Sequence, residues 1–328
     1  MAKPVEADVV LACGEHLPAV DVWMVIDVLR ATTVIVRWFE LGGGDLYPAA
    51  SVGAARDLAR KLSNEGETPL LMGEENAIPP AGFDLGNSPL DLSREAVQTH
   101  SCAVMATSNG TKALLDAAAT GTPVLAACCR NALAALEHAL SIGSRIGLLC
   151  AGRRRRPGWD DMLCAGLLLA ELRRDHPGLV LADSARLALL AWQSAGSFQE
   201  SMASADHAVF LSKIGYGADI AFACEQDVAS VVPMLHEKPD GDGMIAVLRN
   251  SAGDRPNLPR LRRAAAASGA TGTHRRRAPA PDKFASFLQY IEDGAQYFFL
   301  GSEGRKKDSL EKKLRMRQGY SDRSRTKD

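Results

Sequence analysis

Short apolar segments alternate with amphipathic segments along the first 150 residues of the chain. The apolar segments are typical of buried strands, and several of the segments between them carry apolar residues at helical spacing. Strands separated by single helices form crossover units, which build a largely parallel sheet. The expected strands cover residues 7–13, 22–28, 45–50, 69–73, 102–106, 123–129 and 145–152, and the expected helices cover 32–42, 51–66, 110–121 and 131–143.

The pattern changes near residue 155. Residues 159–226 read as mostly helical, with amphipathic helices at 160–175 and 183–195. Two further apolar segments, 228–235 and 244–250, predict a strand pair joined by the turn-rich sequence HEKPDGDG. We therefore expect one folded α/β unit over residues 1–250, with sub-parts at about 1–155 and about 156–250.

The charge of the chain is unevenly distributed. Residues 251–328 hold 18 basic and nine acidic side chains, so that 20 of the 38 basic and 30 of the 39 acidic side chains fall within residues 1–250. The sequence after residue 250 lacks core periodicity and reads as a basic linker and tail with one possible helix at its centre. We expect this tail to be disordered. Its basic charges are interspersed with acidic ones and lack the aromatic pattern of RNA-binding modules, which argues against a nucleic-acid partner.

Composition also indicates the cellular compartment of the protein. No apolar stretch approaches the roughly 20 residues that a membrane-spanning helix requires. The apolar stretch near the N-terminus is interrupted by charges, unlike that of a signal peptide. The seven cysteines include no CxxC pair, which is typical of reduced residues in a protein core. We expect a cytoplasmic protein with no membrane partner, and a homo-oligomer is the default for a soluble enzyme.

Polar side chains follow several expected strands at the point where each strand ends. The carboxyl ends of parallel strands are where ligands collect in such sheets. The polar residues at these positions are Asp27, Arg30, Thr32 and Thr33; Glu74 and Glu75, with Asn87 and Ser88 beyond them; Thr107, Ser108, Asn109, Gly110 and Thr111; and Arg153 to Arg156, with Asp160 and Asp161 beyond them.

This set of side chains suits a phosphorylated acid held together with a hard metal ion. Helix starts such as ATT and SNGT present free amides to phosphate oxygens, and arginine adds paired donors. Mg²⁺ takes one or two carboxylates, waters and substrate phosphate oxygens, so Asp27, Glu74 and Asp161 are its candidate ligands. Each signal taken alone also fits a structural role, such as a helix cap at Asp27 or in SNGT, or first-turn charge at Asp160 and Asp161.

Five motifs, in order, resemble those of the 2-phosphosulfolactate phosphatase family: VIDVLRATT, GFDLGNSP, TSNGT, DDMLCAG and HAVFLSKIGYGADIAFACEQDVASVVP. The resemblance covers roughly residues 5–250. It implies a two-part α/β architecture, the second part smaller, with the active site in the cleft between the parts. It also implies Mg²⁺-dependent hydrolysis of 2-phospho-3-sulfolactate, a small and doubly anionic substrate, to sulfolactate and phosphate, a step towards coenzyme M.

The resemblance puts the matching residues in the active site. With the chemistry of their side chains, this predicts a catalytic set of Asp27, Arg30 and Asp161, metal ligands Asp27, Glu74 and Asp161, and substrate or phosphate ligands Thr32, Thr33, Asn87, Ser88, Ser108, Asn109 and Gly110. His207 and Asp219 match the last motif. From the sequence, Asp27 can serve either as a metal ligand or as a nucleophile.

Two positions depart from the family pattern. Glu75 stands where the family has arginine, and Asp160 stands where it has glutamate. The loss of the arginine leaves open two alternatives. In one, the enzyme hydrolyses another 2-phospho carboxylate; in the other, the protein binds phosphorylated metabolites without turnover. Arg153 to Arg156 offer positive charge that could replace the missing arginine.

Overall fold

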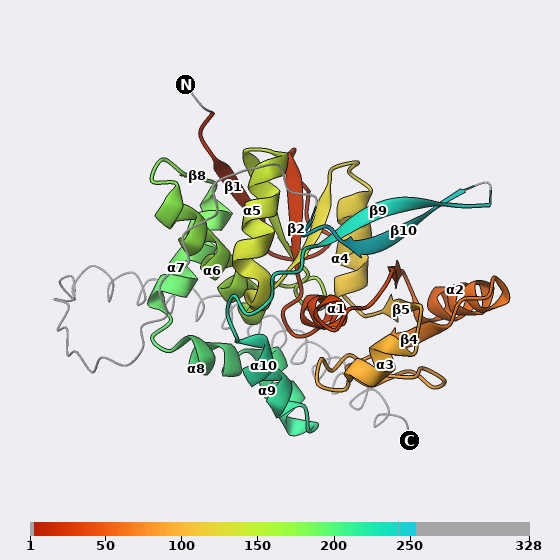
Figure 1. Ribbon diagram of the computed structural model, residues 1–328. Coiled ribbons are helices and arrows are strands. Elements are labelled where there is room, and N and C mark those ends of the chain that lie inside the picture. The colour runs from red at the N-terminus through yellow and green to blue at the C-terminus, as the bar shows by residue number, and fades with distance from the viewer. Residues whose placement is uncertain (1–2, 242, 254–328) are drawn as a thin grey trace, which may run out of the picture. The chain divides into compact units, whose positions relative to one another are not determined.

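The computed structural model describes residues 3–241 and 243–253 (Figure 1). Within them the strands form one ten-stranded sheet in the order β4-β5-β3-β10-β9-β6-β2-β7-β1-β8, and most neighbouring pairs are parallel, which confirms the predicted α/β class. The strands are β1 (Glu6–Val10), β2 (Val22–Ile26), β3 (Leu46–Ala49), β4 (Pro69–Gly73), β5 (Cys102–Ala106), β6 (Val124–Ala127), β7 (Arg145–Cys150), β8 (Val180–Leu181), β9 (Pro233–Asp240) and β10 (Gly243–Asn250).

Helices connect most of these strands and continue the chain after β7. They are α1 (Ala31–Glu40), α2 (Val52–Asn64), α3 (Arg94–Gln98), α4 (Gly110–Ala118), the 3₁₀ turn η1 (Cys129–Asn131), α5 (Ala132–Ile142), α6 (Trp159–Asp175), α7 (Asp183–Ser194), α8 (Phe198–Ala203), α9 (Asp206–Lys213) and α10 (Gly217–Ala223). The expected crossover helices and the mostly helical stretch 159–226 are confirmed. The short elements α3 and β8 carry too little periodicity to be predicted.

The sheet consists of two parallel blocks joined by an antiparallel hairpin. The large block is β6-β2-β7-β1-β8, the small block is β4-β5-β3, and the hairpin β9–β10 lies between them. Three antiparallel pairings in succession make the two blocks run in opposite directions. Each junction is a single residue pair, Leu125 with Met234 on one side and Leu46 with Leu248 on the other. Residues 156–250 thus contribute their strands to the same sheet.

The hairpin differs from the prediction in its first strand. The strand expected at 228–235 begins only at Pro233 and continues through the turn-rich stretch to Asp240. Residues 227–232 before it are irregular because part of their backbone bonds to the 3₁₀ turn η1. The Asp227 amide donates to the Cys129 carbonyl at 3.1 Å, and the Ala229 amide donates to the Arg130 carbonyl at 2.9 Å.

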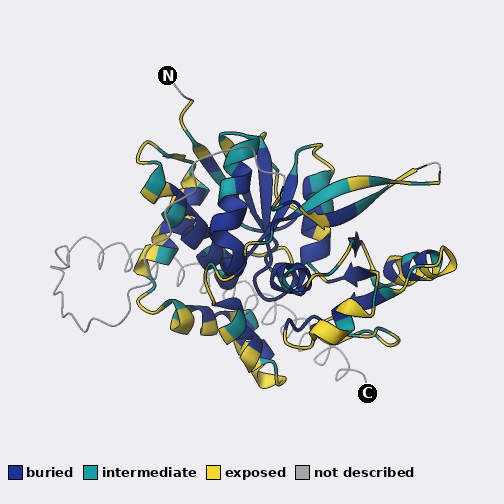
Figure 2. Cartoon of the chain, viewed as in Figure 1, coloured by how far each residue is buried: buried dark blue, intermediate teal, exposed yellow. Residues whose placement is uncertain are grey.

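Strand β2 lies at the centre of the core, and all five of its residues are buried. Its side chains alternate between two layers, as the two-residue period of a strand requires. Val22, Met24 and Ile26 pack with residues of α5, α6 and α7, whereas Trp23 and Val25 pack with residues of α1 and α4. Figure 2 shows β2 and α1 dark blue, while α2 has an exposed yellow side.

Helix α1 forms although its sequence is poor in strong helix formers. Its run of β-branched residues, Thr32 to Val36, has low helix propensity, but every one of these side chains is buried. Packing of the helix between the sheet and its neighbours outweighs the intrinsic preference.

In the described residues no helix is long and apolar enough to cross a membrane. The predicted tail and its helix lie outside the described residues, apart from residues 251–253.

Candidate active site

Asp27 directly follows β2, and its carboxylate is buried against the first turn of α1. Oδ1 accepts a hydrogen bond from the Ala31 amide at 3.2 Å. The Asp27 carbonyl accepts from the amide and the hydroxyl of Thr32, both at 2.9 Å. The Thr33 hydroxyl donates to the Val28 carbonyl at 2.8 Å. The two threonines expected to bind phosphate therefore hold the turn that carries Asp27.

Glu74 follows β4, and both of its carboxylate oxygens accept hydrogen bonds. Oε1 accepts from the Ser108 amide at 2.7 Å, and Oε2 accepts from the Ala77 amide at 2.5 Å and from the Ser108 hydroxyl at 3.2 Å. Glu74 thus ties the loop after β4 to the loop after β5. Glu75 is exposed, and its amide bonds to the Ile78 carbonyl. Its charge therefore faces solvent outside this buried group.

The start of α4 lies directly over Asp27. A Cβ atom on Gly110 would stand 2.4 Å from the Ala31 Cβ and 2.6 Å from Asp27 Oδ2, so only glycine fits at this position. Asn109, half-buried, precedes the helix and makes no side-chain cap. Within residues 3–241 and 243–253, the amides of Asn109 and Gly110 donate to no protein acceptor. Free amides at a helix start are suited to binding an anion, and here they lie beside a buried carboxylate.

Asp161 belongs to the first turn of α6 and joins two strand ends. Its Oδ1 accepts from the Val28 amide and its Oδ2 from the Gly152 amide, each at 2.9 Å. The carboxylate therefore links the loop after β2 to the loop after β7. Asp160 beside it is also buried. His207 of α9 has its Nδ1 3.9 Å from Asp160 Oδ2.

Arg30 is buried and paired with a residue far along the chain. Its Nη1 donates to Asp219 Oδ2 at 2.8 Å and its Nη2 donates to the Ala77 carbonyl at 3.1 Å. The guanidinium lies over the Tyr216 ring, 4.3 Å from the centroid. The other oxygen of Asp219 accepts from the Ser88 hydroxyl at 2.7 Å. The predicted residues Arg30 and Ser88 are thus joined through Asp219. Tyr216 lies in the last of the five motifs, but its contact with Arg30 was not predicted.

Asn87 directly precedes Ser88 in the chain and is 4% exposed. Its Oδ1 is buried and has no hydrogen-bond partner among the described residues. A buried polar atom without a partner costs free energy, about 1–3 kcal/mol. A bound water or ligand that donates a hydrogen bond to this oxygen would remove that cost.

Burial and crowding raise the pKa values of the aspartates. Burial, with smaller contributions from the charges of Asp160 and Glu74, raises the pKa of Asp27 to about 7, although the Ala31 amide opposes the rise. Burial raises the pKa of Asp160 to about 6. Burial and the charges of Asp160 and Asp27 hold the pKa of Asp161 well above its usual range. The site therefore has an excess of buried negative charge when these groups ionise.

His207 lies among cations as well as beside Asp160. Burial lowers its pKa to about 4, and the charges of Arg153 and Arg30 add to the effect. The imidazole is therefore neutral near pH 7 and forms no ion pair with Asp160 there.

The structure gathers most of the predicted site residues at one place. Asp27, Glu74, Ser108, Gly110 and Asp161 meet through direct contacts or the mutual effects of their charges. Arg30, Ser88 and Asp219 form an adjoining network. In the described part of the chain, no group of three or more His, Cys, Asp or Glu side chains stands in an arrangement that could hold a metal ion by itself.

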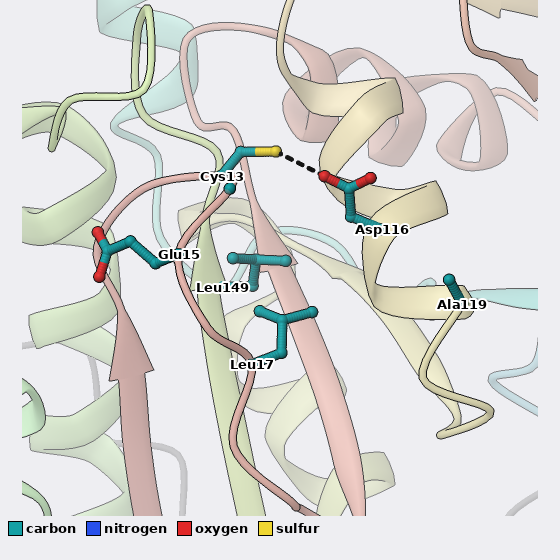
Figure 3. Close-up of a pocket in the computed structure, with 7 residues that line it drawn as sticks. Cys13, Glu15, Leu17, Asp116, Ala119 and Leu149 are labelled. Atoms are coloured by element: carbon teal, nitrogen blue, oxygen red, sulfur yellow. Dashed lines mark hydrogen bonds between the residues drawn. The ribbon is translucent and has the colours of Figure 1, made fainter.

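A separate hollow lies on another side of α4 (Figure 3). It is lined by Cys13, Gly14, Glu15, Leu17, Asp116, Ala119 and Leu149, none of which is a predicted site residue. The Cys13 thiol donates to Asp116 Oδ2 at 3.0 Å. Burial and this aspartate raise the pKa of Cys13 to about 11, so the thiol stays protonated and unreactive near neutral pH.

Comparison with known proteins places these residues in a family. A sequence profile described as 2-phosphosulpholactate phosphatase matches residues 12–238. A probable 2-phosphosulfolactate phosphatase of Deinococcus radiodurans is 36% identical over 239 residues, which cover 73% of this chain and 95% of that protein. Proteins with the same name are 36% identical over 229 residues in Thermus thermophilus, covering 68% of this chain and 91% of the relative, and 30% identical over 234 residues in Pseudothermotoga lettingae, covering 70% and 95%. With the match spanning the strands and loops that build this site, the chain belongs to the 2-phosphosulfolactate phosphatase family.

Proposed function

We propose that the protein is a phosphoric monoester hydrolase that converts 2-phosphosulfolactate to sulfolactate and inorganic phosphate. The family match and the names of the relatives support this assignment, and the chain covers nearly the whole length of those relatives. The place of this reaction on a route to coenzyme M is a further proposal, which rests on the family resemblance alone.

One observation supports the activity above all. A buried carboxylate, Asp27, lies directly under the free amides that begin α4. A phosphoryl group bound by the amides of Asn109 and Gly110 would place its oxygens beside this carboxylate. Hydrolysis of a phosphate monoester is governed by positioning and by stabilisation of charge on the phosphoryl oxygens. The oriented amides supply that stabilisation without reorganising during the reaction.

The donor set fits Mg²⁺. Several buried carboxylates with raised pKa values leave negative charge without a counter-ion, and oxygen ligands are those that Mg²⁺ prefers. Asp27 Oδ2 accepts no hydrogen bond from the described residues, whereas both oxygens of Glu74 and of Asp161 already accept them. Asp27 would therefore be the principal ligand, with Asp161 and Glu74 beside it. Bound Mg²⁺ would neutralise charge on phosphoryl oxygens and acidify a water molecule.

The protein's own groups have defined tasks in this proposal. Glu74 holds the Ser108 loop, and Asp161 holds the Asp27 loop, so that the helix start and the carboxylate keep their relative positions. Arg30 is held by Asp219 and places positive charge at the edge of the site. Asp27 serves either as a metal ligand or as the attacking nucleophile, and both roles require its carboxylate.

The test is phosphate release by the purified protein, with Mg²⁺ or with EDTA, from 2-phosphosulfolactate, phospholactate, phosphoglycolate and 2-phosphoglycerate. We expect Mg²⁺-dependent release with 2-phosphosulfolactate preferred. Asp27→Asn should lower kcat by at least about 100-fold, because loss of a single preorganised catalytic group typically costs that much. Glu75→Gln is the matched control, since its side chain is exposed and lies one residue from Glu74.

Other outcomes of this test have definite meanings. Preference for one of the three compounds that carry a carboxylate but no sulfonate would indicate a related phosphatase of another 2-phospho carboxylate. No release from any compound by folded protein would refute the hydrolase and leave a binder of phosphorylated metabolites. Full activity of the Asp27→Asn variant would refute both roles considered for Asp27.

A further inference from the structure

The loop between β7 and α6 holds four consecutive arginines in a rigid turn. The backbones of Arg153 and Arg156 exchange two hydrogen bonds, at 2.9 and 3.0 Å. Arg154 and Arg155 occupy the turn between them with φ of 53° and 60°, the left-handed region. The turn therefore fixes where each arginine side chain begins.

Arg153 differs from the other three in its surroundings. It is half-buried, whereas Arg154, Arg155 and Arg156 are exposed. Its guanidinium lies over the ring of Phe210 on α9, 4.9 Å from the centroid. This stacking orders a side chain that would otherwise be mobile in solvent.

Phe210 and His207 join Arg153 to the buried Asp160. The rings of Phe210 and His207 stack with their centroids 6.5 Å apart, and His207 Nδ1 lies 3.9 Å from Asp160 Oδ2. Arg153 therefore lies on the side of the site where α6 and α9 meet. Arg30 is neutralised by Asp219. Arg153 has no carboxylate within ion-pair distance and no side-chain hydrogen bond among residues 3–241 and 243–253.

An ordered, half-buried guanidinium without a counter-ion beside a phosphate site is suited to an anion. At the start of α4, free amides are available for the phosphoryl group, and Arg30 is already hydrogen-bonded to Asp219. A guanidinium presents paired donors that match the oxygens of a carboxylate or a sulfonate. We propose that Arg153 binds an acidic group of the substrate other than its phosphate, the carboxylate or the sulfonate, and so determines specificity for 2-phospho acids over simple phosphate monoesters. This inference rests on the proposed function, whose substrate class it defines.

The test compares three phosphate monoesters: 2-phosphosulfolactate, phospholactate and isopropyl phosphate, which lacks a second anion. The measured quantity is the ratio of kcat/KM for each of the two 2-phospho acids to kcat/KM for isopropyl phosphate. In Arg153→Ala this ratio should fall by about 10- to 100-fold, the range for a charge-assisted hydrogen bond. Arg153→Lys should lose less, because it retains the charge but not the paired donors. Phospholactate carries a carboxylate beside its phosphate, and 2-phosphosulfolactate carries a carboxylate and a sulfonate. A fall for both substrates would indicate that Arg153 binds the carboxylate, and a fall for 2-phosphosulfolactate alone would indicate the sulfonate.

Arg156→Ala is the matched control. It removes the same charge from the same turn, but its side chain is exposed and has no ring contact. We expect its ratio to stay within about 3-fold of that of the original protein, as for a distant screened charge. An equal fall in Arg156→Ala and Arg153→Ala would overturn the inference in favour of a general electrostatic effect. A uniform loss of activity on all three substrates in Arg153→Ala would also overturn it.

A binding measurement separates this inference from the proposed activity. Calorimetric titration of sulfolactate, with Mg²⁺ and phosphate present, should give a Kd about 10- to 100-fold weaker in Arg153→Ala than in the original protein. If the protein releases no phosphate but shows this difference, the hydrolase is refuted and the role of Arg153 stands. If the original protein does not bind sulfolactate, or the variant binds it equally well, Arg153 does not hold the second anion.

Discussion

At the scale of single residues, the site is built from buried acids whose ionisation opposes folding. Asp27, Asp160 and Asp161 are each less than 9% exposed, and each has a raised pKa. Asp219 is equally buried, and Arg30 and Ser88 bond to its two oxygens. Asp27, Asp160 and Asp161 therefore form the part of the site that a bound cation would stabilise. The charge of Asp219 is balanced by Arg30 within the protein.

Stability without metal should therefore depend on pH in a defined direction. An acid whose pKa is higher in the folded state binds more protons there, so its contribution to stability is complete below about pH 4 and falls as pH rises towards 7. In EDTA, Asp27→Asn should raise Tm relative to the original protein, and the difference should grow between pH 5 and pH 7.5. Each tenfold change in acidity corresponds to about 1.4 kcal/mol.

Differential scanning fluorimetry at the two pH values measures this effect. Added Mg²⁺ should raise the Tm of the original protein more at pH 7.5 than at pH 5, because deprotonated carboxylates bind the ion better. Asp116→Asn provides a control, since this aspartate lies away from the site, and the Lys112 and Cys13 contacts lower its pKa. A Tm difference for Asp27→Asn that is the same at both pH values would contradict the raised pKa.

At the scale of secondary-structure elements, the site depends on how closely two helix starts approach. Helix α1 begins at Ala31 and α4 begins at Gly110, and these two residues touch above Asp27. The sequence TSNGT indicated a helix start, but not why its glycine stands there. Its φ is not in the left-handed region, so the requirement comes from the neighbouring helix and the carboxylate rather than from the local backbone.

Gly110→Ala should consequently remove activity and lower stability. The added methyl would lie 2.4 Å from the Ala31 Cβ, and relief requires movement of one of the two helices. Overpacking of this kind costs about 1–3 kcal/mol. Gly53→Ala in α2 is the control, because the nearest atom to its Cβ is 3.8 Å away and alanine favours the helix. Chemical denaturation and phosphate release would measure both effects; a stabilised, active Gly110→Ala variant would show that α4 lies further from Asp27.

At the scale of the whole molecule, the two strand blocks meet through the hairpin β9–β10. Asp27 directly follows a strand of the large block and Asp161 lies in the helix start after another, whereas Glu74 and Ser108 come from loops that follow the small block. The blocks run in opposite directions, and among the described residues strand pairing connects each block to the hairpin through a single residue pair. The hairpin therefore helps to hold the two halves of the site together.

Leu248→Ala tests this role of the hairpin. Leu248 is fully buried, pairs with Leu46, and packs in the cluster that contains Trp23 and Met72. Its truncation should lower the free energy of unfolding by about 2–5 kcal/mol. We also expect KM to rise more than kcat falls, as the halves lose alignment. Met244→Ala on the same strand, 57% exposed, should change neither quantity measurably. If the Leu248→Ala variant is destabilised but its KM is unchanged, the hairpin stabilises the fold and does not align the two halves of the site.

The sequence by itself determined the α/β class, the strands and the longer helices of the first 150 residues, and the polar residues at the strand ends. It could do so because strand and helix periods and cap residues are local properties of the chain. It misplaced β9, since the backbone of residues 227–229 bonds to the distant 3₁₀ turn η1. Only the tertiary structure decided that the Thr32 and Thr33 hydroxyls bond to the backbone, that Asp219 pairs with Arg30, and that Arg153 has no counter-ion among the described residues. These outcomes depend on which charges and carbonyls come together from residues far apart in the sequence, and no local pattern records that.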